Sequence, residues 1–358
     1  MIIAEADVGN VIQMVFGIFA AEDSLECYTY TKMERSVIPT SFASLETEWQ
    51  ELLATSTANH IFFTSQWQKA WWQVFGGDYE SFLLSIIDNG KLVGIAPLKR
   101  KDGKISFIGS SDVCDYMDFI AQSGQEEYVF SRLIDYLDKN EWSTIEFDSV
   151  LPDSLALKFF VPLAQQKGYQ ISTTQTNVSP QLVLPSSREN YISSLNAKDR
   201  HEIRRKIRRL EQIQSVNYFT ITEKERMPGA AESFFKLFRL SNGEKAGFMT
   251  DKKREFFSAM ISSLAEHGNI RLSFMEIGAN PASSTLCFDY NNDIYLYNSA
   301  FDRAYSALSA SLLLEVYNIW DAINNGKKRF DFLSGNEPYK YDLGGRDVPL
   351  YHCVVSRS

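Results

Sequence analysis

Two periodicities of apolar residues alternate along the chain. Apolar residues at three- and four-residue steps predict amphipathic helices, and runs of β-branched and aromatic residues between turn residues predict strands. In the first half we expect helices over 45–53, 61–75, 126–137 and 155–167, and strands over 82–87, 91–98, 104–108 and 142–147. In the second half we expect helices over 187–195, 198–209, 228–240, 254–266 and 312–323, and strands over 182–184, 217–221, 269–277, 284–290, 294–297 and 330–333.

Both halves show the same order of elements: helix, helix, strand, strand, strand, helix, strand. The repeat lies in this order and not in residue identity. We therefore predict an α/β (α+β) fold of two related units in tandem, with mixed central sheets flanked by helices. A chain of 358 residues is long enough for two domains. We place them at 41–180 and 181–358, after an N-terminal arm over 1–40.

The N-terminal arm contains an apolar stretch from Val8 to Ala21. The stretch is too short for a membrane span, and Glu5 and Asp7 precede it where a signal peptide carries basic residues. We therefore expect a cytoplasmic protein with neither a membrane span nor a secretory signal.

Charge and cysteine content narrow the classes of partner. The net charge is −9 and the pI about 5.2, which argues against a DNA-binding protein or a general binder of anionic membranes. The four cysteines and four histidines are widely scattered without the spacing of metal ligands. We expect no metal site and reduced, buried thiols.

One helix start in the second half has the composition of an anion site. Ser306, Ser309, Ala310 and Ser311 stand where the first turn of the helix is expected. Small side chains leave backbone N–H groups free to face a phosphate, and the helix dipole adds positive character. Serine is also a common N-cap, so an ordinary capped helix is the alternative.

The most basic stretch is KDRHEIRRKIRR, from Lys198 to Arg209. Its seven basic and two acidic side chains give a local charge of about +5. Ile203 and Ile207 anchor one apolar side, so the arginines lie on the remaining surface. The alternatives are a solvated face, an anion site for a phosphorylated substrate, a polyanionic glycan or cofactor phosphates, and contact with RNA.

Several polar residues are candidates for chemistry. Asp331 lies between apolar strand residues, where a carboxylate acts either as a general base of raised pKa or as a structural acceptor. Glu337 and Lys340 lie in the loop after that strand, a usual place for substrate contacts. Lys340 would polarise an acyl carbonyl or hold a carboxylate or phosphate. Asp112, Asp115 and Asp118 suggest a solvated loop at the domain cleft more than a metal site.

Two stretches resemble a known family. The first is Gly94 to Leu98, GIAPL, at the end of a strand that follows a tryptophan-rich helix. The second runs from Tyr295 to Lys340 and carries Ala307-Leu308-Ser309, Gly326, Phe330-Asp331-Phe332-Leu333 with Gly335, and Glu337-Pro338-Tyr339-Lys340. These residues resemble the CelD-like acetyltransferase family of cellulose biosynthesis. That family belongs to the GNAT superfamily and is related to the FemAB/FemX aminoacyl transferases.

The resemblance implies two tandem GNAT-like domains and direct acyl transfer from acetyl-CoA or another acyl-CoA, without a metal. The acceptor it implies is an amine or hydroxyl of a sugar or polysaccharide precursor or a related small molecule. The cofactor-binding residues would be Ser306, Leu308, Ser309, Ala310 and Ser311. The substrate-binding residues would be Arg204, Arg205, Arg208, Tyr297, Arg303 and Tyr339, and the catalytic residues Asp331, Glu337 and Lys340.

Two alternatives remain. A FemX-like enzyme would take its acyl group from aminoacyl-tRNA, with tRNA as a partner. A GNAT fold without catalysis would serve as a binding or assembly factor in exopolysaccharide production. The glycine-rich pyrophosphate motif of ordinary GNAT enzymes is missing here, which favours the second alternative.

Overall fold

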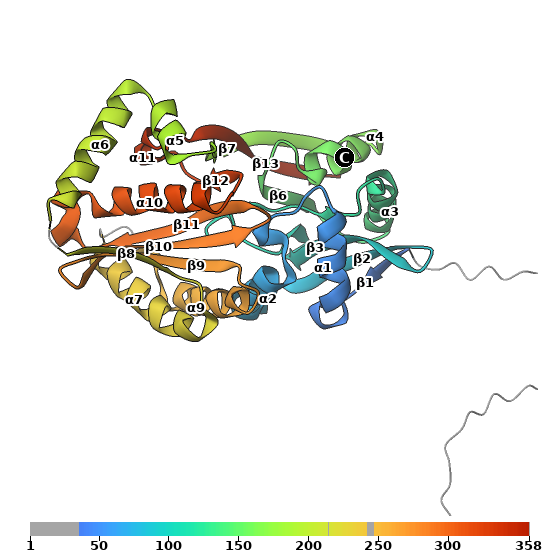
Figure 1. The fold of residues 1–358 in the computed structure, drawn as a ribbon. Helices are drawn as coiled ribbons and strands as arrows, with labels where there is room; N and C mark the ends of the chain where they lie inside the picture. The colour runs from blue at the N-terminus through green and yellow to red at the C-terminus, as the bar shows by residue number, and fades with distance from the viewer. Residues whose placement is uncertain (1–35, 214, 242–246, 358) are drawn as a thin grey trace, which may run out of the picture. The chain divides into compact units, whose positions relative to one another are not determined.

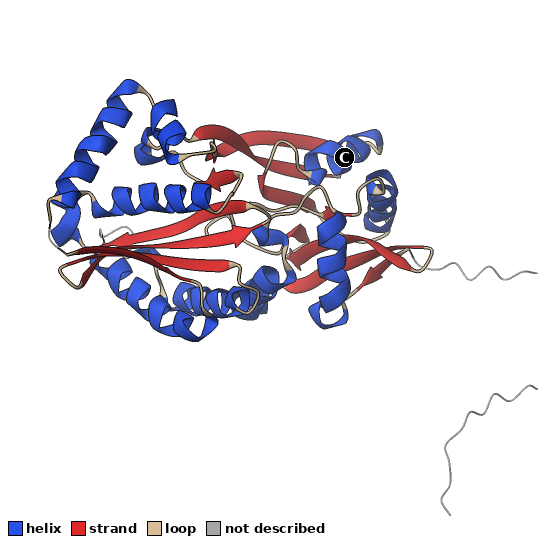
Figure 2. Ribbon diagram, viewed as in Figure 1, coloured by secondary structure: helices blue, strands red, loops and turns tan. Residues whose placement is uncertain are grey.

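A mixed β-sheet runs through both halves of the chain (Figures 1 and 2). The computed structural model describes residues 36–213, 215–241 and 247–357. Strands of the described residues are β1 (Val37–Pro39), β2 (Glu80–Asp88), β3 (Lys91–Lys101), β4 (Lys104–Phe107), β5 (Ile120–Ala121), β6 (Thr144–Val150), β7 (Gln170–Val183), β8 (Val216–Ile221), β9 (Ile270–Ile277), β10 (Asn280–Tyr290), β11 (Asp293–Phe301), β12 (Arg329–Asp331) and β13 (Arg346–Ser356). Their order is β1-β2-β3-β4-β6-β13-β7-β12-β11-β10-β9-β8, with β5 against β3.

Helices cover both faces of the sheet. The α-helices are α1 (Glu46–Thr55), α2 (Ser65–Phe75), α3 (Glu126–Asp138), α4 (Val161–Gln166), α5 (Arg188–Ser194), α6 (Ala197–Glu211), α7 (Met227–Leu240), α9 (Asp251–Ala265), α10 (Ala310–Asn324) and α11 (Pro338–Asp342). Short helical turns are η1 (Phe42–Ser44), η2 (Ile61–Phe63), η3 (Gly76–Asp78), η4 (Ala156–Phe160), η5 (Lys224–Arg226) and η6 (Arg303–Leu308). In the second half, α7 and α9 lie on one face of β9–β11, and α10 lies on the other (Figure 1).

The sheet repeats one arrangement from each edge inward. From one edge, β1, β2, β3 and β4 are antiparallel and β6 is parallel to β4; from the other, β8, β9, β10 and β11 are antiparallel and β12 is parallel to β11. The last strand of each half then crosses over. β7 pairs with β12, and β13 pairs with β6, while β7 and β13 pair with each other. The predicted α/β fold of two repeated units is confirmed, with both units joined in a single sheet.

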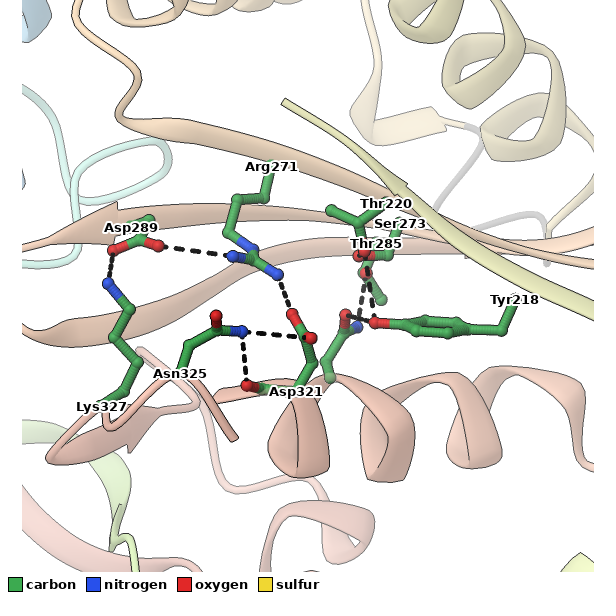
Figure 3. Close-up of polar contacts among 10 residues, drawn as sticks. Tyr218, Thr220, Arg271, Ser273, Thr285, Asp289, Asp321, Asn325 and Lys327 are labelled. Atoms are coloured by element: carbon green, nitrogen blue, oxygen red, sulfur yellow. Dashed lines mark hydrogen bonds and ion pairs between the residues drawn. The ribbon is translucent and has the colours of Figure 1, made fainter. Parts of the chain in front are cut away.

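Polar contacts fix α10 on its face of the sheet (Figure 3). Arg271 of β9 forms ion pairs with Asp289 of β10 and Asp321 of α10, and Lys327 pairs with Asp289. Beside them, the Asn318 amide donates to Thr285 Oγ1 at 2.8 Å. These bonds complement an apolar seam that includes Leu313, Val316 and Ile319, all fully buried. They set the position of the helix along the strands, and so the position of its first turn.

The structure differs from the sequence-based elements at several places. β7 has 14 residues where only 182–184 was expected, because the polar stretch Ser172–Asn177 shows no apolar alternation. β13 was not predicted. Residues 338–342 form the short helix α11 and not a loop, and the expected helix over 61–75 divides at Thr64, which caps α2. Residues 1–35 of the expected arm lie outside the described residues, and 37–39 form β1. The proposed domain bound at 180/181 falls within β7.

Because β13 lies at the centre of the sheet, shortening one of its buried side chains should lower the stability of the protein strongly. Leu350 is 1% exposed, and replacement by alanine should lower the free energy of unfolding by about 2–5 kcal/mol. Val183 on the neighbouring β7 is 81% exposed, and Val183→Ala should change it by less than about 0.5 kcal/mol. Urea unfolding of the two variants measures both values. Equal effects would contradict a core position for β13.

Candidate functional site

The parallel strands β11 and β12 part soon after they pair. They pair between residues 293–295 and 329–331, and then β12 ends while β11 continues to Phe301. A cavity of about 410 Å³ lies at this divergence. Its wall from β11 is Leu296–Ser299, and its wall after β12 includes Phe332–Ser334, Glu337, Tyr339 and Lys340. Beyond Tyr295 no strand of the described sheet takes the place of β12 beside β11.

A β-bulge shapes the β11 wall. Leu286 of β10 lies opposite Asn298 and the next residue, Cys287, lies opposite Leu296, so Tyr297 has no partner residue on β10. A bulge bends its strand and changes the direction of the backbone groups. The cavity wall is therefore a bent strand whose backbone N–H and C=O groups lie next to an opening.

The opposite wall is a tight turn held by Lys340. Leu333 has φ +59° and Gly335 has φ +115°, both in the left-handed region. The Lys340 ammonium donates to the carbonyls of Leu333, Ser334 and Gly335 at 3.0, 2.8 and 3.1 Å, and pairs with Glu337 at 2.9 Å. Because four acceptors surround the ammonium of a residue that is 2% exposed, the ammonium stabilises a backbone conformation that non-glycine residues rarely adopt.

Asp331 lies behind this turn, fully buried. Its carboxylate accepts from Leu333 N at 2.9 Å, Tyr116 OH at 2.8 Å, Ser179 Oγ at 3.2 Å and Gln181 Nε2 at 3.1 Å. Burial raises the pKa of Asp331 to about 6, against the lowering effect of the Leu333, Tyr116 and Ser179 donors and of Arg329. Four donors occupy the oxygens and the residue does not line the cavity, so the contacts favour the structural alternative for Asp331 over the general base.

A loop of the first half forms the third wall of the cavity. Ser111–Asp115 line it, and the loop is fixed to the second half at several points. Tyr297 OH donates to Val113 O at 2.7 Å, Ser334 N donates to Asp115 Oδ1 at 2.9 Å, and Lys253 pairs with Asp112 at 3.0 Å. The expected solvated loop is therefore corrected. Asp112 is exposed, but Asp115 is half-buried against the second half.

Asp118 departs furthest from the solvated interpretation. It is 3% exposed and accepts from the backbone N–H groups of Phe119, Leu155 and Ala156. A carboxylate in this position satisfies the unpaired N–H groups at the start of η4. Its role is that of a helix cap inside the first half.

The expected cofactor residues lie at the far end of β11. After Phe301 the chain forms η6, and Ser309, with φ +56°, is the N-cap of the 15-residue α10 without a side-chain cap bond. Ser306 is exposed, Leu308, Ser309 and Ser311 are half-buried, and Ala310 is buried. None of these five residues is among those lining the cavity, although Ser299 of the same strand is.

The arginine-rich helix α6 packs beside that helix start. Leu210 is buried with Ala310, and Ile207 packs against the same cluster as Tyr305 and Leu308. Arg205 pairs with Glu202 at 2.8 Å. Arg204 and Arg208 are exposed and form no ion pair with any residue in the described ranges, and Arg303 at the start of η6 is also exposed.

The structure thus brings together part of the predicted site. Glu337, Lys340, Tyr297 and Tyr339 meet at the cavity, with Asp331 behind it. Sequence reasoning gave the loop Ser111–Asp115 only as a solvated loop at the domain cleft, and it missed the wall residues Phe238, Phe248, Asn298 and Ser299. The cluster of aspartates was a signal for this loop, but its contact with a segment 219 residues away is visible only in three dimensions.

Comparisons with known proteins agree with the fold described above. Residues 197–341 match the family model "Acetyltransferase (GNAT) domain". The crystal structure of FemX is similar to this chain, with a TM-score of 0.63 and 10% identity over 88% of this chain and 96% of that chain. A conserved protein of unknown function from Bacteroides thetaiotaomicron has a TM-score of 0.59 and 10% identity, over 90% of this chain and 100% of that chain.

A third solved structure is the C-terminal domain of a protein provisionally named lysylphosphatidylglycerol synthetase, from Agrobacterium fabrum. It has a TM-score of 0.55 and 8% identity, over 88% of this chain and 92% of that chain. A comparison with curated protein sequences gives no significant match. Residues 197–341 are therefore similar to a GNAT acetyltransferase domain, and the chain has a FemX-like fold. Membership of the CelD-like family stays a prediction.

The Asp331 contacts predict a pH-dependent role for Tyr116. Its hydroxyl donates to Asp331, and hydrogen bonds to an ionised partner are worth about 1.5–3 kcal/mol. Asp331 ionises as the pH rises through about 6, so the bond to the charged form exists above that pH. Tyr116→Phe should therefore lower the free energy of unfolding more at about pH 8 than at about pH 5.

Urea unfolding at the two pH values measures this difference. Tyr290→Phe is the control, because Tyr290 OH donates to the neutral Asn59 Oδ1 at 2.7 Å and its loss should be the same at both pH values. A Tyr116→Phe effect that does not change with pH would contradict an ionised Asp331 as its partner.

Proposed function

We propose that the protein is an acyltransferase that moves an acyl group, most simply acetyl, from acyl-CoA directly to an amine or hydroxyl acceptor. The observation that carries this proposal is the cavity where β11 and β12 part. The pantetheine arm of CoA is an extended chain with two amide groups. An open strand edge is suited to such a chain, because backbone N–H and C=O groups pair with it as they would with another strand. The GNAT domain match over 197–341 supports the same donor.

The phosphate end of the donor would lie at the start of α10. β11 leads from the cavity to η6 and Ser309, so a donor along the strand reaches Ser306, Leu308, Ser309, Ala310 and Ser311. Backbone N–H groups of a helix start and the helix dipole favour a diphosphate. Arg303 and the exposed Arg204 and Arg208 supply positive charge nearby, from η6 and from the adjacent α6.

Direct transfer requires few side chains. The acceptor nitrogen or oxygen attacks the thioester carbon, the carbonyl oxygen becomes negative, and CoA leaves as the thiol. Backbone N–H groups of the bulged segment at Tyr297 would stabilise that oxygen. Lys340 would act as a positioning residue, because its ammonium already holds the turn 333–335. Glu337, 56% exposed and paired with Lys340, would contact the acceptor.

The proposed acceptor is a sugar or polysaccharide precursor or a related small molecule, in a cytoplasmic setting. Tyr297, Tyr339 and Asn298 line the cavity, and these side chains suit a sugar, which presents both hydroxyl groups and apolar ring faces.

In the described ranges, no cluster of three or more His, Cys, Asp or Glu side chains is placed to bind a metal ion. No helix found there has the length and apolar character needed to cross a bilayer.

A second candidate donor is aminoacyl-tRNA. The observation that favours it is the exposed arginine surface of α6, where Arg204 and Arg208 have no acidic partner in the described part of the chain. Because this surface adjoins η6 and the start of α10, it would contact the polyanionic part of a donor whose acyl end lies in the cavity. A third candidate, an assembly factor without catalysis, would bind neither donor.

Acetyl-CoA should stabilise the protein against thermal unfolding. A ligand at 100 times its dissociation constant adds about 2.7 kcal/mol to the free energy of unfolding. Asn298→Trp places a large ring in the cavity and should weaken acetyl-CoA binding at least about tenfold, a loss of about 1.4 kcal/mol. Val183→Trp, on an exposed site of β7, is the matched control and should bind normally. Unchanged melting of the wild-type protein at millimolar acetyl-CoA would contradict the proposed donor.

The tRNA alternative predicts binding that depends on salt and on α6. Aminoacyl-tRNA affinity should fall linearly on a logarithmic scale of salt, and the double variant Arg204→Gln, Arg208→Gln should reduce the slope by about one unit per arginine. The control is Arg132→Gln with Lys139→Gln, which removes two exposed cations, one on α3 and one at its C-terminal cap. Filter binding of charged tRNA measures the slopes. Equal slopes for both double variants would exclude α6 as the tRNA surface.

A further inference from the structure

Three carboxylates lie around the turn 333–335, and they differ in the hydrogen bonds and ion pairs that they form. Asp331 accepts four hydrogen bonds and does not line the cavity. Glu337 lines the cavity and is paired with Lys340 at 2.9 Å. Asp115 lines the cavity as well, and its Oδ1 accepts from Ser334 N at 2.9 Å. Within the described ranges no donor contacts Asp115 Oδ2, which leaves this oxygen available for a proton.

Burial and the neighbouring charges set the pKa of Asp115 near neutral pH. Burial raises its pKa to about 7, and the carboxylates of Asp331 and Glu337 add to this effect. The Ser334 N–H and the Lys340 ammonium act in the opposite direction. Asp112 on the same loop is already occupied, because it forms an ion pair with Lys253 and accepts a hydrogen bond from Ser110 Oγ. A general base works best when its pKa lies near the working pH.

The loop that carries Asp115 is fixed on both sides of it. Val113 O accepts from Tyr297 OH at 2.7 Å, and the next residue, Tyr116, is buried with its hydroxyl on Asp331 at 2.8 Å. Tyr297 is also the bulged residue of the β11 wall. The loop that carries Asp115 and the backbone wall of the cavity are therefore joined through the Tyr297 side chain, although they belong to different halves of the chain.

We propose that Asp115 is the general base of the acyl transfer, an assignment that rests on the proposed function. Asp115 Oδ2 takes the proton of the acceptor N–H or O–H as the new nitrogen–carbon or oxygen–carbon bond forms. The carbon–sulfur bond then breaks, and the CoA thiolate takes a proton from the Asp115 carboxylic acid. The products are the acylated acceptor and the CoA thiol, and Asp115 returns to its ionised form. The first half of the chain thus supplies the catalytic residue, and the second half supplies the donor site.

The test compares Asp115→Asn with the wild-type protein in release of thiol from acetyl-CoA, with water and with glucosamine as acceptors. The wild-type kcat/KM for acetyl-CoA should rise with pH through about 7 and then level off, because Asp115 must be ionised to accept the proton. Asp115→Asn should lose about 10²–10⁴-fold in kcat and lose that rise, with the KM for acetyl-CoA within about twofold. Asp115→Glu should restore part of the rate and the pH dependence.

Asp88→Asn is the matched control, because it makes the same change of charge in the β2–β3 hairpin, and it should keep the wild-type rate. A wild-type rate and pH profile in Asp115→Asn, in protein that acetyl-CoA still stabilises, would overturn the assignment and leave the proposed function standing. Absence of stabilisation by acetyl-CoA in the wild-type protein would count against the proposed function itself.

A donor-independent measurement completes the test. The Asp115 carboxyl is identified as the resonance missing from Asp115→Asn in ¹³C spectra of aspartate-labelled protein, and it should titrate near pH 7. Titration below about pH 5, the ordinary range of an aspartate, would overturn the base assignment whatever the donor.

Discussion

The hydrogen bonds to the buried carboxylate of Asp331 hold the two halves of the sheet in one arrangement. A charge without solvent must be met by donors, and here they come from three separate places in the chain: Tyr116 in the first half, Ser179 and Gln181 on the shared strand β7, and Leu333 just beyond β12. Removing any donor leaves the carboxylate less compensated, so these segments are held in one arrangement. The apolar residues of both halves would tolerate small shifts that this network does not.

That arrangement decides where the cavity opens. The Asp331 network fixes the end of β12, and Lys340 fixes the turn that follows, with Leu333 and Gly335 in the left-handed region. Because β12 stops there while β11 continues with a bulge at Tyr297, the two strands separate at a defined residue. Tyr116 carries the same constraint to the loop of the first half, which closes the third side of the cavity. The site is thus a product of buried polar contacts more than of apolar packing.

Strand exchange at the centre of the sheet explains why the two repeated units act as one body. β13 lies between β6 and β7, and β7 lies between β13 and β12, so each half is completed by hydrogen bonds from the last strand of the other. Cys353, Leu350 and Val355 are buried along this seam. Without the partner strand, each half would end there in an edge strand with unpaired backbone N–H and C=O groups. A site built from both halves is the natural consequence, since the halves cannot separate without breaking the sheet.

Local pattern was sufficient for much of this molecule. Helices α6, α7, α9 and α10 follow from apolar periodicity, because their buried residues recur at helical spacing. Strands β2, β3, β9 and β10 follow from apolar runs between turn residues, and their buried residues form nearly continuous runs. The repeated order of elements and the residues Glu337, Lys340, Tyr297 and Tyr339 at one cavity were also accessible from sequence. β7 was not, because a polar central strand is recognised by its backbone partners and not by its side chains. The sequence by itself determined the elements and the candidate residues. Only the tertiary structure decided that Asp331 is enclosed by four donors while Asp115 faces the cavity, because the environment of a carboxylate depends on segments that are distant along the chain.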